Sequence, residues 1–190
     1  MAADASGVDV VLEGNVEKAE QRFDRVLVAI GRRPNTETLG LEAAGVRMDE
    51  NGFIAVDERQ RTSIPHIYAV GDIAGGVMLA HKAMVEGKVA AEVIAGRSSA
   101  FDVRAIPAVV YTDPQIAWAG ITEESARQQG MAVAVEKFPW KFAGRALTTC
   151  TPVGLTKMII DADTRRVIGV GITGRGAEGL IAEGVLAIEM

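Results

Sequence analysis

The sequence contains few of the residues that build disulfides, metal centres or nucleophilic triads. Cys150 is the single cysteine among 190 residues, so these residues hold no internal disulfide, Cys-x-x-Cys pair or cysteine-built zinc site. His66 and His81 are the only histidines, and they stand too far apart in the sequence to suggest a metal centre. No Ser-His-Asp grouping and no phosphate-binding P-loop can be assembled from the remaining residues.

Basic charge and long apolar runs are also scarce. Lys and Arg number 20 against 25 Asp and Glu, with no dense basic run, so we expect no nucleic-acid partner. Charges interrupt every apolar stretch before the roughly 20 residues that a bilayer requires, so we expect no membrane span. The first nine residues lack the basic and apolar regions of a secretory signal. We therefore expect a cytoplasmic protein in a reducing compartment.

The composition is otherwise that of a globular protein of one large or two small domains. Hydrophobic residues make up 48% and charged residues 24% of the chain. Aromatic residues reach only 5%, whereas glycine occurs 21 times. This combination predicts tight turns and close approaches of the backbone.

The first half of the chain alternates short apolar runs with turns. Residues 8–12 and 67–70 are rich in β-branched or aromatic residues and predict strands. Residues 26–30 are continuously apolar, which predicts a strand of a parallel sheet buried on both faces. We also expect a short helix over 38–44 and a short strand over 53–56.

Residues 79–95 predict the longest helix of the chain, ended by Gly96. Its charged residues, Lys82, Glu86, Lys88 and Glu92, fall away from the face that we expect to be buried. The residues predicted to share that buried face are Leu79, Ala83, Met84, Gly87, Ala90, Ala91 and Ile94.

After about residue 104 the pattern becomes mainly extended. The predicted helices cover 122–129 and 177–190, and residues 161–164 predict a hairpin turn. The fold class expected is therefore the end of an α/β nucleotide-binding domain, followed by an α+β domain with an antiparallel sheet and helices on one face. The strands predicted in the second part cover 108–112, 116–121, 132–138, 155–161 and 167–172.

Gly71 and Asp72 form the most informative motif, because they join a predicted strand to the long helix. A carboxylate at the end of a strand can accept hydrogen bonds from ligand hydroxyls, and Gly71 lets a ligand approach the backbone. The start of the next helix adds unpaired amides and a positive dipole end, which suit a phosphate or a reduced flavin. Alternatively, Asp72 only caps a turn.

Two other glycine motifs are weaker. Gly31 follows the apolar run 26–30 and precedes two arginines, so it marks either a contact with an anionic nucleotide or a simple turn. Residues 169–174 match G-x-G-x-x-G, but their first two glycines lie inside an apolar run and no further strand with an acidic end follows. We interpret these glycines as strand positions against a close neighbour.

Four longer strings together carry a family resemblance. They are Val-Leu-Val-Ala-Ile-Gly-Arg-Arg-Pro-Asn at 26–35, Thr-Ser-Ile-Pro-His-Ile-Tyr-Ala-Val-Gly-Asp at 62–72, Met-Leu-Ala-His-Lys-Ala at 78–83, and Tyr-Thr-Asp-Pro-Gln-Ile-Ala-Trp at 111–118. With them the chain resembles the FAD-dependent pyridine nucleotide–disulfide oxidoreductases, and especially their dihydrolipoamide-oxidising branch. Gln115 departs from the pattern, since glutamate is usual there.

The resemblance implies a role in electron transfer between dihydrolipoyl groups and NAD⁺ through FAD and an active-site disulfide. It implies no catalytic residue within these 190 positions, because the family's redox cysteines and its His-Pro-Thr segment fall outside them. It implies that Gly31 touches NAD and that Asp72 binds the ribityl or phosphate-linked part of FAD. The cofactor-binding residues expected on this basis are Gly31, Gly71, Asp72, Met78, Leu79, Ala80 and His81.

The same resemblance divides the chain into three parts. Residues 1–30 would end an NAD-binding domain, 31–104 would form the C-terminal part of an FAD-binding domain, and 105–190 would form most of a dimerisation domain. The expected partners are a second copy, giving a homodimer, and the lipoyl-bearing acyltransferase of a 2-oxo-acid dehydrogenase complex. By itself this internal piece is expected to be inactive.

Two other interpretations stay open on the sequence. One is a different disulfide reductase of the family, acting on a glutathione-like disulfide, or a transhydrogenase. The other is a non-catalytic dimerisation module formed by the residues after about 104.

Overall fold

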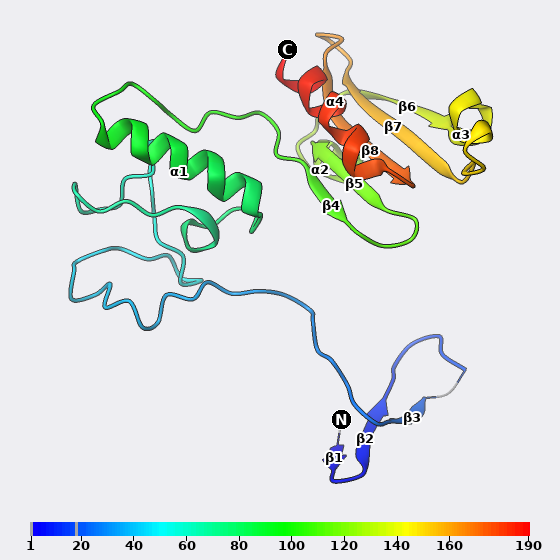
Figure 1. The fold of residues 1–190 in the computed structure, drawn as a ribbon, viewed down its shortest axis with the longest axis horizontal. Helices are drawn as coiled ribbons and strands as arrows, with labels where there is room; N and C mark the ends of the chain where they lie inside the picture. The colour runs from blue at the N-terminus through cyan, green and yellow to red at the C-terminus, as the bar shows by residue number, and fades with distance from the viewer. Residues whose placement is uncertain (1, 18) are drawn as a thin grey trace. The chain divides into compact units, whose positions relative to one another are not determined.

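The computed structural model describes residues 2–17 and 19–190, which form two compact units. The first unit ends at Pro34, and the second runs from Asn35 to Met190 (Figure 1).

The first unit is a three-stranded antiparallel meander. Arg22 fastens it by ion pairs of 2.7 Å to Asp4 and to Asp9. The Arg22 guanidinium lowers the pKa of the exposed Asp4 carboxyl by donating a hydrogen bond to it. The strands, in spatial order, are β1 (Ala2–Asp4), β2 (Gly7–Val11) and β3 (Glu20–Phe23).

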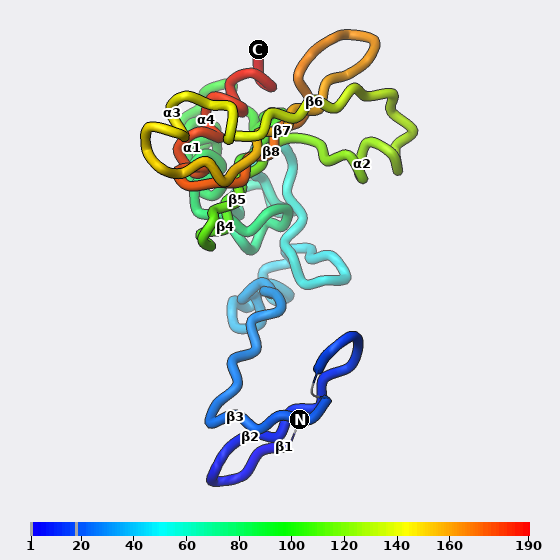
Figure 2. The backbone as a smooth tube through the Cα atoms, turned by 90° about the vertical axis from the view of Figure 1, so that its right-hand side faces the viewer, coloured from blue at the N-terminus to red at the C-terminus, as the bar shows by residue number. Residues whose placement is uncertain are grey.

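The strand predicted over 26–30 is wrong for this chain. The segment has no regular secondary structure (Figure 2), and Leu27 and Ile30 are 89% and 96% exposed. A buried parallel strand needs neighbours along both edges, and no described residue forms a ladder with this one. The apolar pattern indicates that these side chains favour burial, but no described part of the chain covers them.

The second unit begins with loops and turns around a small core of Val46, Ile54 and Ala69. The strands predicted over 53–56 and 67–70 shrink to single bridges, Met48–Ile54 and Arg61–Tyr68. The helix predicted over 38–44 is a series of turns. A short 3-10 helix, η1 (Gly71–Ala74), then leads toward the long helix α1 (Ala80–Ile94).

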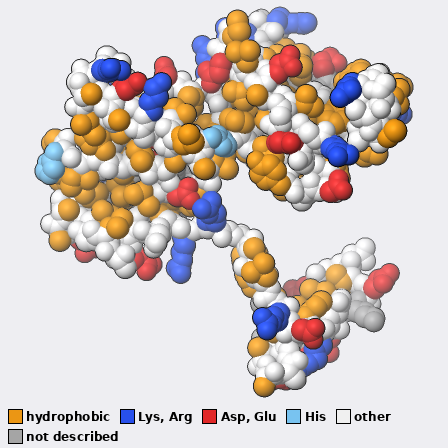
Figure 3. All heavy atoms as spheres, in the orientation of Figure 1, with side chains coloured by type: hydrophobic (Ala, Val, Ile, Leu, Met, Phe, Trp, Pro, Cys, Tyr) orange, Lys and Arg blue, Asp and Glu red, His pale blue; other side chains and the backbone are white. Residues whose placement is uncertain are grey.

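Helix α1 lies where the sequence predicts it, but its buried face differs from the expected one. Met84 and Ile94, predicted to be buried, are 76% and 65% exposed. Hydrophobic side chains accordingly lie on the surface of the region that contains α1 (Figure 3). Ala90 is buried as predicted, but the charged residues Lys82 and Glu86 are also buried on that side of the helix. The residues buried in α1 are Lys82, Glu86, Val89, Ala90 and Val93.

The predicted antiparallel domain is confirmed as a five-stranded sheet with strand order β4-β5-β8-β7-β6 (Figure 1). A hairpin turn at Asp161 joins β7 to β8, and the Asp161 carboxylate accepts hydrogen bonds from the amide and hydroxyl of Thr164. These bonds lower the pKa of Asp161. The elements of this domain are β4 (Ala108–Val110), β5 (Ile116–Gly120), α2 (Glu123–Gln128), β6 (Val133–Pro139), η2 (Trp140–Phe142), α3 (Gly144–Thr148), β7 (Gly154–Asp161), β8 (Val167–Gly174) and α4 (Ala177–Glu189).

The core of this domain lies between α4 and one face of the sheet. Ala117 and Ala119 of β5 are 0% and 1% exposed and pair with Ile172 and Val170 of β8. Alternate residues of a strand share a face, so these four side chains project together toward α4. There they join Ile181 and other apolar residues of the helix in one buried cluster.

The G-x-G-x-x-G string at 169–174 lies in the antiparallel strand β8, where its first and last glycines serve close packing. A Cβ at Gly169 would lie 2.1 Å from the carbonyl oxygen of Ile121. A Cβ at Gly174 would lie 2.3 Å from the ring of Trp140. A side chain at either position would displace main chain or an aromatic ring, which explains glycine here without a nucleotide.

We predict that Gly169→Ala destabilises the chain by about 1–3 kcal/mol or more, because the added methyl group overpacks against main chain. Gly179→Ala in α4 is the matched control, since a Cβ there meets nothing within 4 Å. It should stabilise the helix by up to about 1 kcal/mol. Urea unfolding monitored by circular dichroism measures both changes, and equal stability of the two variants would contradict the packing role of Gly169.

Candidate functional site

The candidate site is the turn at Gly71 and Asp72, where η1 meets the first turns of α1. Gly71 is buried with φ +78°, a conformation that L side chains rarely adopt. A Cβ at Gly71 would lie 3.2 Å from Cβ of Ala83. Glycine therefore lets the turn bend sharply and lets α1 pack directly on it.

A buried ion pair on α1 holds this turn. Nζ of Lys82 lies 2.6 Å from Oε1 of Glu86, and each side chain is only 5% exposed. The Gly71 amide donates to Oε2 of Glu86 at 2.7 Å, and Nζ of Lys82 donates to the Gly71 carbonyl at 3.5 Å. The helix thus binds both main-chain polar groups of Gly71, while each buried charge has an opposite charge beside it.

Sequence reasoning missed Lys82 and Glu86 because it assigned charged residues to the solvent side of the helix. The available signal was their i, i+4 spacing, which places the two side chains next to each other on a helix. Spacing alone does not distinguish an exposed pair from a buried one.

The start of α1 has open amides, as the sequence predicts. Leu79 precedes the helix in an extended conformation, with no side-chain hydrogen bond to cap it. The Ala83 amide donates to the Leu79 carbonyl, but within the described chain the amides of Ala80 and His81 have no hydrogen-bond acceptor. Unpaired amides and the helix dipole make this end favourable for negative charge.

The His81 side chain makes a contact that the sequence does not reveal. Its Nε2 lies 2.7 Å from the carbonyl oxygen of Pro107. Because a carbonyl only accepts, Nε2 carries the proton and donates it. The His81 ring therefore ties the first turn of α1 to the segment that enters β4, and leaves its own amide as the group open to a ligand.

Six of the seven predicted cofactor residues fall in the second unit, around one turn. Gly71 and Asp72 belong to η1, Met78 and Leu79 directly precede α1, and Ala80 and His81 begin it. Gly31 belongs to the first unit, where a Cβ would meet nothing within 4 Å.

These residues fit one end of a flavin. Open amides at the start of α1 suit the ring edge that becomes negative on reduction, and the half-buried Asp72 suits a hydroxyl-bearing chain. The G-x-G-x-x-G string, by contrast, offers no place for the pyrophosphate, because its first and last glycines, Gly169 and Gly174, pack against main chain and the Trp140 ring. The fit is therefore to part of the cofactor.

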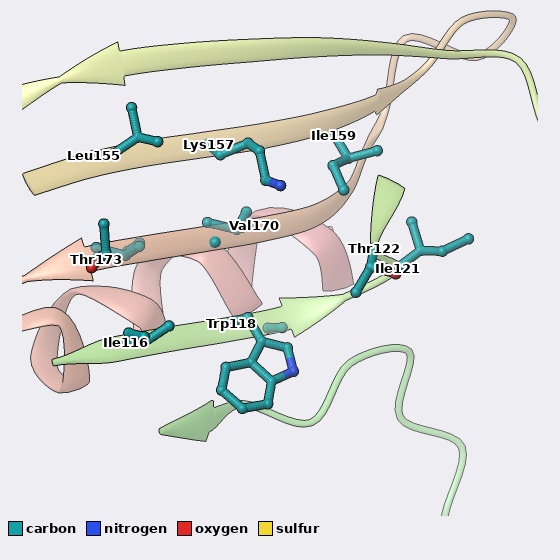
Figure 4. A pocket seen from close by; sticks show the side chains of 12 residues that line it. Ile116, Trp118, Ile121, Thr122, Leu155, Lys157, Ile159, Val170 and Thr173 are labelled. Carbon is teal, nitrogen blue, oxygen red and sulfur yellow. The ribbon is translucent and has the colours of Figure 1, made fainter. Parts of the chain in front are cut away.

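A second candidate surface is the open sheet face, the side of the sheet away from α4, formed by Ile116, Trp118, Leu155, Lys157 and Ile159. The strand register places Ile116 beside Thr173, and places Trp118 and Lys157 on either side of Gly171. Figure 4 looks onto this face, which contains a hollow of about 280 Å³. Ile116 and Trp118 are 46% and 39% exposed, which leaves apolar area available for contact.

Two ion pairs that share Glu123 border the open sheet face, and the longer joins Nζ of Lys137 to Oε1 of Glu123 at 3.9 Å. Nζ of Lys157 lies 2.7 Å from Oε1 of Glu123. The hydrogen bond and positive charge of Lys157 lower the pKa of the half-buried Glu123 carboxyl.

Neither a metal centre nor a membrane span is found in residues 2–17 and 19–190. No three His, Cys, Asp or Glu side chains among them gather as ligands. No helix there combines the length and the hydropathy needed to cross a bilayer.

Comparison with known proteins gives two family matches. The family described as pyridine nucleotide-disulphide oxidoreductase matches residues 1–87, and its dimerisation domain matches residues 106–190. Dihydrolipoyl dehydrogenase of Haemophilus influenzae is 50% identical over 184 residues, covering 97% of this chain and 38% of that protein. The Vibrio cholerae enzyme of the same name is 49% identical over 189 residues, covering 99% of this chain and 40% of its own. The chain thus spans about two fifths of the length of these relatives.

Solved structures agree with these matches. The HOCl-induced flavoprotein disulfide reductase RclA from Escherichia coli has a TM-score of 0.83 and 27% identity, covering 98% of this chain and 42% of that one. LpdA from Mycobacterium tuberculosis has a TM-score of 0.84 and 28% identity, covering 97% and 40%. From these matches along almost its whole length, the chain belongs to the pyridine nucleotide-disulphide oxidoreductase family.

Proposed function

We infer that the chain is part of a dihydrolipoyl dehydrogenase, which oxidises protein-bound dihydrolipoamide with NAD⁺. The observation that carries this proposal is the identity of about 50% to enzymes of that name along nearly the whole chain. In the overall reaction the dithiol loses two electrons and two protons, and lipoamide, NADH and one proton are formed. The solved structure whose title names a disulfide reductase, RclA, is only 27% identical to this chain and gives less support to another disulfide substrate.

The proposed cofactors are FAD and NAD. Bound FAD would supply the two-electron relay between a dithiol and the nicotinamide. Gly71 and Asp72 would hold its ribityl or phosphate-linked part, and Met78, Leu79, Ala80 and His81 would lie along its ring. Gly31 would contact NAD. Lys82 and Glu86 would not contact the cofactor themselves but would position Gly71 and Asp72, because they hydrogen-bond to the main chain of Gly71.

The proposed domain division follows from the same assignment. Residues 1–30 would end the NAD-binding domain, 31–104 would belong to the FAD-binding domain, and 105–190 would form the dimerisation domain. A homodimer, a lipoyl-bearing acyltransferase as partner and a cytoplasmic location complete the proposal. The family match to a dimerisation domain supports the homodimer.

A chimera tests this function. These 190 residues would replace the matching segment of the H. influenzae dihydrolipoyl dehydrogenase. We predict that the chimera binds FAD and reduces NAD⁺ with dihydrolipoamide, whereas the chain alone purifies without stoichiometric flavin absorbance and has no such activity. A folded, flavin-bound chimera that turns over only another disulfide would overturn the substrate assignment. Sustained activity of the isolated chain would contradict its expected inertness.

We predict that Glu86→Gln destabilises the chain by about 3–5 kcal/mol, because it leaves the buried Lys82 charge without a counter-charge. The glutamine oxygen can still accept a hydrogen bond from the Gly71 amide, so the loss of stability measures the effect of removing the negative charge. In the control, Lys82→Met together with Glu86→Gln, most of the stability should return. Urea unfolding measures both, and a single variant as stable as the unaltered chain would show that the pair is not buried as described.

We predict that the chain self-associates through the open sheet face. Ile116→Lys places a charge on that face and should raise the dissociation constant about tenfold or more, since one desolvated charge costs more than 1.4 kcal/mol. Met84→Lys on α1 is the control, because Met84 is 76% exposed and lies outside that face. Light scattering over a concentration series measures both. A strictly monomeric chain would remove the homodimer from the proposal for these residues.

A further inference from the structure

A hollow of about 710 Å³ lies in the antiparallel domain, between the η2–α3 segment, β7 and α4. We call it the Trp140 hollow, and its lining includes Phe138, Trp140, Arg145, Arg175 and Leu180. Its volume falls within the range of about 300–1,000 Å³ typical of small-molecule sites. Neither the turn at Gly71 and Asp72 nor the open sheet face includes these five residues.

Trp140 gives the hollow a rigid apolar wall. The indole is 8% exposed, and its Nε1 donates to the hydroxyl of Thr156 at 3.0 Å. Its ring fills the space that side chains at Gly154 and Gly174 would take, at 2.4 and 2.3 Å from a Cβ at each. A ring held by a hydrogen bond and by close packing loses little freedom when a ligand stacks on it.

The charge of the hollow is entirely positive. Arg145 and Arg175 both line it, and no aspartate or glutamate does. Within the described chain neither guanidinium makes a hydrogen bond or an ion pair. Arg22, Lys82 and Lys157, by contrast, each have a carboxylate within 2.7 Å. Arg145 and Arg175 are both exposed residues, so their charges are accessible to an anion from solution.

We propose that the Trp140 hollow binds a small organic dianion with a flat apolar body, of the aromatic dicarboxylate class. Guanidinium groups recognise carboxylates through paired, charge-assisted hydrogen bonds, and two such groups match two carboxylates. The apolar body of the ligand packs against Trp140, Phe138 and Leu180. This site is independent of the proposed redox function, since it involves neither the turn at Gly71 and Asp72 nor the Lys82–Glu86 ion pair.

The indole of Trp140 provides the readout. The chain has two tryptophans, so Trp118→Phe leaves Trp140 as the sole indole, and Trp118 lies on the open sheet face. Terephthalate, a flat dianion, is titrated into this variant while tryptophan fluorescence is recorded. We expect a saturable change, weakened about tenfold or more by Arg145→Gln or by Arg175→Gln. Added salt should weaken binding as well, because it screens exposed charges.

Two controls decide the outcome. Arg166→Gln removes an exposed arginine of the β7–β8 turn and should leave terephthalate affinity unchanged. The neutral 1,4-benzenedimethanol, of similar size and shape, should bind at least about tenfold more weakly. The proposal is overturned if millimolar terephthalate gives no saturable change, if the neutral diol binds equally well, or if folded Arg145→Gln and Arg175→Gln variants retain full affinity. Circular dichroism confirms that each variant is folded.

Discussion

The buried Lys82–Glu86 ion pair is the interaction on which the turn at Gly71 and Asp72 depends. Two opposite charges on one face of α1 hold the amide and the carbonyl of the same glycine. Because both charges are removed from water, each needs the other, and the turn cannot move without leaving polar groups unpaired. The pair thus converts a helix face into a fixed support for Gly71 and Asp72, while the open amides one turn earlier stay free for a ligand.

The antiparallel domain is organised by a different constraint, the absence of side chains at particular positions. Gly169 lets β8 approach the carbonyl of Ile121, and Gly154 and Gly174 make room for the ring of Trp140. The same close packing that removes the G-x-G-x-x-G string from nucleotide binding fixes the indole that forms the wall of the Trp140 hollow. A pattern typical of one function therefore serves another purpose in this fold.

Local patterns predicted much of this structure. Strands β5 to β8 and helix α4 lie close to their predicted positions, because alternation of burial and turn residues are encoded nearby in the chain. Residues 26–30 have the pattern of a strand but do not form one, since strand formation depends on partners that a local pattern does not contain. The position of Gly71 between an apolar run and a helix predicts the turn found there. The sequence does not predict the burial of Glu86, because that burial depends on what packs against α1.

The hydrogen bond from His81 to Pro107 requires a particular side chain at the donor but not at the acceptor. The acceptor is a main-chain oxygen, which every amino acid possesses, so replacement of residue 107 need not abolish it. The donor is a ring nitrogen at a set reach from the helix, and few other side chains can supply one there. Substitutions should therefore be tolerated far better at position 107 than at position 81, although both residues take part in the same hydrogen bond.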